Sequence, residues 1–264
     1  DFKAVYLSGA GVANSLLGVP DLGMVTQTEI ANIADLVCQA VDIPVIADGD
    51  TGYGGVHNVA RTIRLYERAG VAAIQLEDQA FPKKCGHFEG KVVVSVEEMV
   101  QRIQAARDAR SDDEGILIIA RTDARASLGL NAAIDRAKIY AEAGADLLFV
   151  EAPHSEEELA QIGSELSGHR LMANMVEFGK TPLLSADRLA ELGYCLIIHP
   201  GAITRAVVEL TRALLGDLRA TGSTTGWLDR MAAFADVNAL VGLPEANEWE
   251  VEISRRAAEV GDSE

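Results

Sequence analysis

The sequence predicts an α/β fold, a (β/α)8 TIM-type barrel followed by a C-terminal helical extension. Its length of 264 residues suits one such barrel. Strand-like and helix-like stretches alternate, and a unit closed by glycine repeats along the chain. We expect the barrel over residues 1–215. We expect the extension over residues 216–264, where a glycine-rich turn precedes helices at 227–234 and 251–260.

Alternation along the chain is the main observation behind the barrel. Strand-like stretches lie at 5–8, 44–47, 72–76, 116–120 and 147–150, and helix-like stretches at 28–40, 56–69, 96–110 and 130–143. The strand-like stretches are short, β-branched and apolar throughout, which is typical of parallel strands that are buried on both faces.

A repeated unit favours a closed barrel over a doubly wound sheet, which is the alternative. In each copy a glycine ends a helix, a buried strand follows, and a distinctive residue stands seven positions after the glycine. No glycine-rich nucleotide-binding motif opens any helix. The three pairs are Gly70 with Glu77, Gly144 with Glu151, and Gly193 with Pro200.

Charge and composition exclude several partners. The chain has 40 acidic and 23 basic residues, and its formal net charge of -17 repels nucleic acid and anionic membrane surfaces. A small anionic substrate therefore needs local cations or a metal. No apolar run is long enough to cross a bilayer, and no signal peptide is present. Because the chain starts at Asp1 rather than Met, we expect that an N-terminal segment was removed or left out.

The cysteines indicate a reducing compartment. Cys38, Cys85 and Cys195 are odd in number and share no CxxC spacing. We therefore expect free thiols and a cytoplasmic protein, with Cys38 and Cys195 filling the core.

Polar residues stand where the predicted strands end. The carboxyl ends of barrel strands meet at one face, and that face carries the active site of such barrels. For any single carboxylate, a solvated loop or a helix N-cap is the alternative. The residues are Tyr6, Ser8, Asp48, Asp50, Glu77, Asp78, Arg121, Asp123, Glu151, Asn174 and Glu177.

Two of these positions indicate a metal. Asp48 and Asp50 follow a buried strand and precede a loop whose glycines let the backbone approach a ligand closely. Oxygen ligands without a nearby pair of His or Cys residues suit Mg²⁺ or Mn²⁺ better than zinc. The alternative is a glycine-rich turn capped by Asp50.

The loop around Cys85 gives the strongest single signal. Cys85 lies beside Lys83, Lys84 and His87, and nearby cations favour a reactive thiolate. The loop is long for a strand-to-helix connection, so we expect it to close over the barrel mouth as a lid. Arg121, after the strand at 116–120, could hold a carboxylate by two hydrogen bonds, and a salt bridge between loops is the alternative.

Together these residues resemble the isocitrate lyase/phosphoenolpyruvate mutase superfamily over nearly the whole chain, from Tyr6 to Arg205. The run Lys-Lys-Cys-Gly-His, from Lys83 to His87, is similar to the signature of the carbon–carbon lyase branch. That branch contains isocitrate, 2-methylisocitrate and 2,3-dimethylmalate lyases, whereas the mutase and decarboxylase branches lack the cysteine. Residues 17–23 and 48–54 also match closely.

The resemblance implies a site that contains Mg²⁺. Asp48 would be the direct protein ligand, and Asp50, Glu77 and Asp21 would act through water. The resemblance also implies a homotetramer in which the C-terminal helices are swapped between subunits.

The same resemblance assigns roles toward the substrate. Cys85, poised by His87 and Lys83, would protonate the enolate carbon of the leaving acid, and Tyr6 would handle the hydroxyl proton. Arg121 would hold the keto-acid half and stabilise charge. The other expected substrate-binding residues are Ser8, Gly9, Gly86, Glu151, Asn174 and Pro200.

The resemblance also ranks the reactions. The chain lacks the large insertion of true isocitrate lyases, which favours a short enzyme that acts on 2-methylisocitrate or a 2-alkylmalate and releases pyruvate. Val176 replaces a hydroxyl residue of the methylisocitrate enzymes, which favours the dimethylmalate type. Pro200 stands where oxaloacetate hydrolases tend to have serine. Oxaloacetate hydrolysis or decarboxylation therefore ranks second, ahead of a phosphonomutase and of a non-catalytic barrel.

Overall fold

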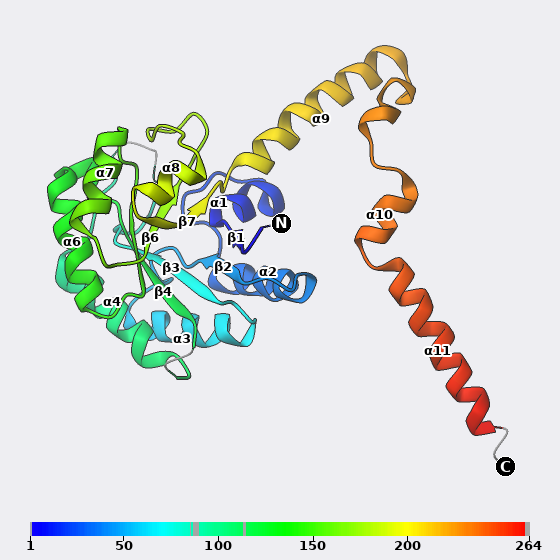
Figure 1. Cartoon of the computed structure of the whole chain (residues 1–264), viewed down its shortest axis with the longest axis horizontal. Helices are drawn as coiled ribbons and strands as arrows, with labels where there is room; N and C mark the ends of the chain where they lie inside the picture. Colours follow the sequence, from blue (N-terminus) through cyan, green and yellow to red (C-terminus); the bar gives the residue numbers. More distant parts are fainter. Residues whose placement is uncertain (1, 85, 87–89, 113–114, 262–264) are drawn as a thin grey trace. The chain divides into compact units, whose positions relative to one another are not determined.

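A computed structural model describes residues 2–84, 86, 90–112 and 115–261 (Figure 1). The chain divides into two compact units, Asp1–Arg205 and Ala206–Glu264. The predicted boundary after residue 215 falls inside helix α9 (Ala202–Thr221).

The first unit is built on one parallel sheet in which sequence order equals spatial order. Each strand pairs with the next in parallel register, for example Tyr6 with Ile46 and Asp48 with Gln75. The predicted class, an α/β TIM-type barrel, is confirmed, although the described residues hold seven strands rather than eight. The strands are β1 (Val5–Leu7), β2 (Val45–Asp48), β3 (Ala73–Glu77), β4 (Leu117–Thr122), β5 (Leu147–Val150), β6 (Leu171–Asn174) and β7 (Tyr194–Ile198).

Helices follow the strands and lie outside them, as Figure 1 shows for α3, α4, α6 and α7. Their starts are set by side-chain caps: Thr26 and Glu29 form a capping box, and Ser95, Ser155 and Ser185 each accept a backbone N–H. The helices are α1 (Gly9–Val12), α2 (Gln27–Ala40), α3 (Val56–Arg68), α4 (Val96–Ala109), α5 (Arg125–Leu128), α6 (Leu130–Glu142), α7 (Glu156–Glu165) and α8 (Ala186–Glu191). A short π-helical turn, Ala13–Leu17, follows α1.

The repeated glycine unit is confirmed. Gly70, Gly144 and Gly193 have φ values of 86°, 110° and 96°, in the left-handed region that glycine adopts without strain. Each ends a helix and leads into β3, β5 or β7. The repeat therefore sets where the strand-end residues fall.

Two apolar clusters fill the unit. The larger lies between the strands and the helices, and it includes Ile30, Ile63 and Ile134. The smaller consists of side chains that alternate with the first set along the strands, and it lies inside the barrel. Its members are Ile46, Ala73, Ile119, Leu147, Phe149, Met172 and Ile198.

The two thiols expected in the core differ in burial. Cys38 is partly buried against the larger cluster, whereas Cys195 is exposed. Cys195 lies on β7, an edge strand of the seven-stranded sheet. Among the described residues, no further strand lies beside β7 to cover Cys195. The core prediction is therefore wrong for Cys195.

The second unit is helical. A 3₁₀ helix, Thr225–Arg230, is followed by α10 (Phe234–Leu240) and α11 (Leu243–Gly261). The predicted helix at 227–234 is wrong, because the chain leaves the helical path at Met231 and a new helix begins after Ala233, whose N–H donates to Asp236. Among the described helices of the whole chain, none is long and apolar enough to span a membrane.

Candidate active site

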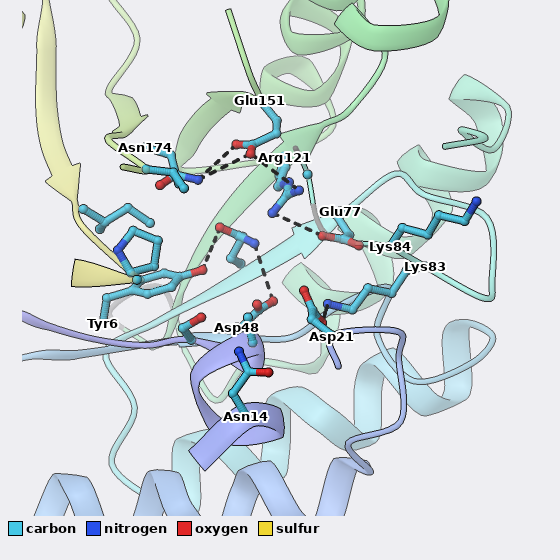
Figure 2. Close-up of a pocket in the computed structure, with 18 of the residues that line it drawn as sticks. Tyr6, Asn14, Asp21, Asp48, Glu77, Lys83, Lys84, Arg121, Glu151 and Asn174 are labelled. Carbon is cyan, nitrogen blue, oxygen red and sulfur yellow. Dashed lines mark hydrogen bonds and ion pairs between the residues drawn. The ribbon is translucent and has the colours of Figure 1, made fainter. Parts of the chain in front are cut away.

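A cavity of about 320 Å³ opens at the carboxyl ends of the strands (Figure 2). Most of the residues predicted to form the site line it, and they come from all seven strands and the connections that follow them. Cys85 and His87, the predicted acid/base and its partner, lie outside the described residues. The predicted residues in the lining are Tyr6, Ser8, Asp21, Asp48, Glu77, Lys83, Gly86, Arg121, Glu151, Asn174 and Pro200.

Asp48 is held from two sides by the backbone. Its Oδ2 accepts the N–H of Gly9 at 3.2 Å, and its Oδ1 accepts the N–H of Asp50 at 3.0 Å. Gly49 lets this turn form: a Cβ there would lie 2.7 Å from Ile74 Cδ1 and 2.8 Å from Gln75 O. The direction of the Asp48 carboxylate is therefore fixed before any ligand arrives.

Lys83 joins two of the predicted metal ligands. Its Nζ lies 2.6 Å from Asp21 Oδ1 and 2.8 Å from Asp50 Oδ1 (Figure 2 shows the contact with Asp21). Burial and the neighbouring Asp48 raise the pKa of Asp50 to about 7, against the opposing effect of Lys83. Burial alone would lower the pKa of Lys83, but the surrounding carboxylates outweigh burial and raise it. The ammonium therefore stays charged among acids.

Arg121 lies at the centre of a second charged group. Its Nε and Nη2 donate to the two oxygens of Asp123 at 2.9 and 3.1 Å, and its Nη1 lies 3.4 Å from Glu77 Oε2. The guanidinium also lies over the Phe149 ring, 5.4 Å from the centroid. Asp123 therefore orients Arg121 and leaves its other edge toward Glu77 and Glu151, as Figure 2 shows.

Gly86 packs directly against this group. A Cβ at Gly86 would collide with Arg121 Nη2 and Glu151 Oε1, so only glycine lets the loop approach so closely. Lys91 donates to the carbonyl oxygen of Gly86 and to Asp123 Oδ1. Lys91 thereby ties the described part of this loop to Arg121.

Two residues that were expected at the rim take other roles. Asp78 accepts hydrogen bonds from Thr122 Oγ1 at 2.7 Å and Tyr140 OH at 2.9 Å, on the helix side of the sheet. Since side chains alternate along a strand, Glu77 and its neighbour cannot both face the interior. Glu177 pairs with Arg205 at 3.2 Å and does not line the cavity.

Sequence reasoning missed several lining residues, Asn14 and Thr204 among them, and three further contributors to the geometry of the site. Phe149 and Gln75 line the cavity, and Lys91 binds Asp123. All three lie before or after the strand ends at which the sequence predicts site residues. The available signal was period-two alternation: Gln75 is polar within a buried strand and stands two positions before Glu77.

The donor set fits a hard divalent cation. The predicted ligands Asp21, Asp48, Asp50 and Glu77 offer the carboxylate oxygens that Mg²⁺ prefers. Glu77 Oε1 is buried without a hydrogen-bond partner among the described residues, and burial raises the pKa of Glu77 well above its usual range. Within the described ranges, no three acidic, His or Cys side chains are arranged to hold an ion together. A site in which water links most carboxylates to the ion needs no such group.

A cavity lined by four carboxylates and four cations, among them a buried arginine, at the strand ends of a TIM-type barrel defines an enzyme site for a small anion. The chain belongs to the phosphoenolpyruvate phosphomutase family, whose profile matches residues 1–219. The predicted isocitrate lyase/phosphoenolpyruvate mutase superfamily is thus confirmed.

Individual relatives indicate which class of reaction within the family fits the chain. The chain is 48% identical over 253 residues to 2,3-dimethylmalate lyase of Eubacterium barkeri, covering 94% of this chain and 86% of the relative. It is 43% identical over 259 residues to 2-methylisocitrate lyase of Aeropyrum pernix, covering 98% and 82%. These relatives support the predicted class, a carbon–carbon lyase.

A solved structure with a different reaction is also similar. Oxaloacetate acetylhydrolase bound to the inhibitor 3,3-difluorooxalacetate superimposes with a TM-score of 0.91 at 36% identity, covering 96% of this chain and 86% of that chain. This similarity confirms the fold, and oxaloacetate hydrolysis or decarboxylation stays the second-ranked reaction.

Proposed function

We propose that the protein cleaves a carbon–carbon bond in a 2-hydroxy di- or tricarboxylate of the 2-alkylmalate or 2-methylisocitrate type. The products are a 2-keto acid, pyruvate, and a carboxylic acid released through its enolate. The observation that carries this proposal is the buried Arg121, held by Asp123 and open toward Glu77 and Glu151 in a cavity at the strand ends. A buried guanidinium of this kind can bind a carboxylate of the substrate.

Magnesium would complete the site, with Mn²⁺ as the alternative ion. Asp48 would bind it directly, and Asp21, Asp50 and Glu77 would bind it through water. Four carboxylates and four cations line the cavity, and Lys83 and Arg121 are already paired with acids, so an anionic substrate would gain from added positive charge. Bound Mg²⁺ would polarise the hydroxyl and carboxylate oxygens of the substrate and stabilise negative charge there.

Residues around the cavity would orient the substrate. Arg121, Ser8 and the backbone of Gly9 would hold the part that becomes the keto acid. Gly86 and Asn174 would hold the other half, with Pro200 forming part of the wall. Asn174 Nδ2 lies 3.4 Å from both oxygens of Glu151, and this contact orients the amide.

The cleavage step needs two proton movements. The substrate hydroxyl loses its proton to solvent water as its carbon becomes a carbonyl, and the electrons of the broken bond form the enolate of the leaving acid. Cys85 would then donate a proton to the enolate carbon, with His87 and Lys83 setting its reactivity. Tyr6 is the group proposed to meet the substrate hydroxyl and to accept its hydrogen bond before the proton leaves.

A substrate panel tests the proposal. A lactate-dehydrogenase-coupled assay with Mg²⁺ would compare 2-methylisocitrate, isocitrate, 2,3-dimethylmalate, 2-ethyl-3-methylmalate and oxaloacetate, with organic-acid products identified by mass spectrometry. Pyruvate with a matching carboxylic acid from one alkylated substrate supports the lyase. Product from oxaloacetate alone would move the protein to the second candidate, hydrolysis or decarboxylation of oxaloacetate.

The similarity to oxaloacetate acetylhydrolase is the observation that favours this second candidate. Pro200 weighs against it, because proline at this strand end offers no hydroxyl to a hydrated ketone. A Pro200→Ser variant that gains oxaloacetate hydrolysis would support that reasoning.

We also propose a homo-oligomer, a tetramer, that works in the cytoplasm. The second unit exposes large apolar side chains, among them Phe234 at 87%, Leu240 at 86% and Val241 at 75%. Apolar surface of this extent favours association, and swapping of these helices between subunits is the proposed arrangement.

A further inference from the structure

We infer that Gln75 is a positioning residue that fixes the Tyr6 hydroxyl as a hydrogen-bond acceptor toward the substrate. This inference rests on the proposed function, because it concerns a substrate that carries a 2-hydroxyl group. Gln75 lies in the middle of β3, is fully buried, and lines the cavity.

The geometry joins three adjacent strands. Gln75 is paired in register with Asp48 on β2, which in turn neighbours β1 and Tyr6. Tyr6 OH lies 2.9 Å from Gln75 Oε1, and Gln75 Nε2 lies 3.5 Å from Asp48 Oδ1. In Figure 2 these contacts are the dashed lines that start at Tyr6 and Asp48 and meet on one side chain.

The chemistry of the three groups sets the direction of each hydrogen bond. Both carboxylate oxygens of Asp48 already accept backbone N–H groups, so the side of the Gln75 amide that faces Asp48 is its NH₂. The flipped amide would place its oxygen against the carboxylate. Gln75 Oε1 therefore faces Tyr6, and the phenol donates its single proton to it.

The direction of these hydrogen bonds determines what Tyr6 can offer the substrate. With its proton committed to Gln75, Tyr6 presents only lone pairs to the cavity. It can accept a hydrogen bond from a substrate hydroxyl, but it has no proton for a keto oxygen or for a carboxylate. Tyr6 therefore selects for a 2-hydroxy group and does not act as a proton donor.

Asp48 does not depend on Gln75. The N–H groups of Gly9 and Asp50 already hold it at 3.2 and 3.0 Å, shorter than the contact with Gln75. Removing the amide should free the Tyr6 hydroxyl to rotate while the carboxylate stays in place. The effect of Gln75 on ligands should therefore pass through Tyr6.

Equilibrium binding measurements test the role of Gln75 without requiring catalytic turnover. Isothermal titration calorimetry with Mg²⁺ would compare malate, which carries a 2-hydroxyl, with oxalate, which has none. The proteins are the wild type, Tyr6→Phe, Gln75→Met and the double variant. We expect each single change to weaken malate binding by about tenfold, the double variant to match Tyr6→Phe, and oxalate to bind the wild type and Tyr6→Phe equally.

Two further variants complete the design. Gln75→His keeps one donor and one acceptor on a neutral ring and should bind malate within about threefold of the wild type. Gln27→Met removes another buried amide, which donates to Thr62 outside this cavity, and it should leave malate binding unchanged.

The outcomes distinguish a failure of the role inferred for Gln75 from a failure of the proposed function. Additive losses in the double variant, or an equal loss for oxalate in Tyr6→Phe, would overturn the role of Gln75 in a protein that still binds both anions. A wild-type protein that binds neither anion would overturn the proposed function as well.

Discussion

At the residue scale, the site depends on carboxylates that the backbone has already oriented. Asp48 accepts N–H groups from Gly9 and Asp50 and needs no ligand to hold its position. Groups fixed in this way bind a cation without reordering, which saves side-chain entropy.

Asp48→Asn tests the metal proposal. The amide retains the shape but loses the charge that an oxygen-bound cation needs, so the dissociation constant for Mn²⁺ should rise by at least about tenfold. Titration followed by electron paramagnetic resonance would measure it. Asp35→Asn, on the exposed face of α2, is the matched control and should bind as the wild type does. Equal affinity in both variants would remove Asp48 from the metal site.

A second residue-scale prediction concerns acid stability. Burial alone would raise the pKa of Asp123, but Arg121 and Lys91 outweigh burial and hold that pKa below its usual value. A carboxylate of this kind stabilises the fold above its unfolded-state pKa, and the contribution is lost as pH falls through the lower folded-state pKa.

Lys91→Met should therefore raise the pKa of Asp123 and move acid unfolding to higher pH, with a loss of roughly 3 kcal/mol at neutral pH. Circular dichroism against pH would follow both quantities. Lys138→Met removes a half-exposed pair with Glu165 and should cost less than about 1 kcal/mol. Identical acid midpoints for Lys91→Met and the wild type would contradict the argument.

At the scale of single elements, the end of β2 is packed too closely for any side chain at Gly49. A Cβ there would press on Ile74 and on the carbonyl oxygen of Gln75. Gly49→Ala should lower the free energy of unfolding by about 1–3 kcal/mol and weaken Mn²⁺ binding, because the turn carries Asp48 and Asp50.

Denaturant unfolding would measure the first effect. Gly55→Ala in the same loop meets nothing within 4 Å and should change the free energy of unfolding by less than about 0.5 kcal/mol. A Gly49→Ala protein as stable as Gly55→Ala would show that β2 and β3 can separate at this point.

Elements also show what the sequence could predict. Up to residue 150, strand and helix positions were predicted to within one or two residues because periodicity and glycine caps are local signals, as at Gly70 and Gly144. In the second unit the predicted helices at 227–234 and 251–260 miss the observed bounds, since α11 already begins at Leu243. The partners of each side chain were not predictable, because they come from neighbouring strands. Lys83 illustrates this: the sequence placed it beside Cys85, whereas its ammonium reaches Asp21, 62 positions away.

At the scale of the whole molecule, the second unit carries the apolar surface that the proposed oligomer needs. A Phe234→Ser/Leu240→Ser double variant should lower the molar mass measured by size-exclusion chromatography with light scattering, because it removes exposed apolar area from this surface. Phe178→Ser, which changes a 98% exposed side chain of the first unit, should leave the mass unchanged. A double variant with the wild-type mass would exclude these two residues from the interface.

Glu77 and Asp78 are adjacent in sequence but serve opposite sides of β3: one faces the cavity, and the other binds Thr122 and Tyr140. The effect of a deletion in this strand should therefore depend on whether an odd or an even number of residues is lost. Loss of one residue exchanges the two acids between cavity and core, whereas loss of two keeps each on its own side and shifts it by about 6.6 Å along the strand. Natural variation in chain length should thus collect in the loops, and β3 should keep its length wherever the cavity keeps its acid.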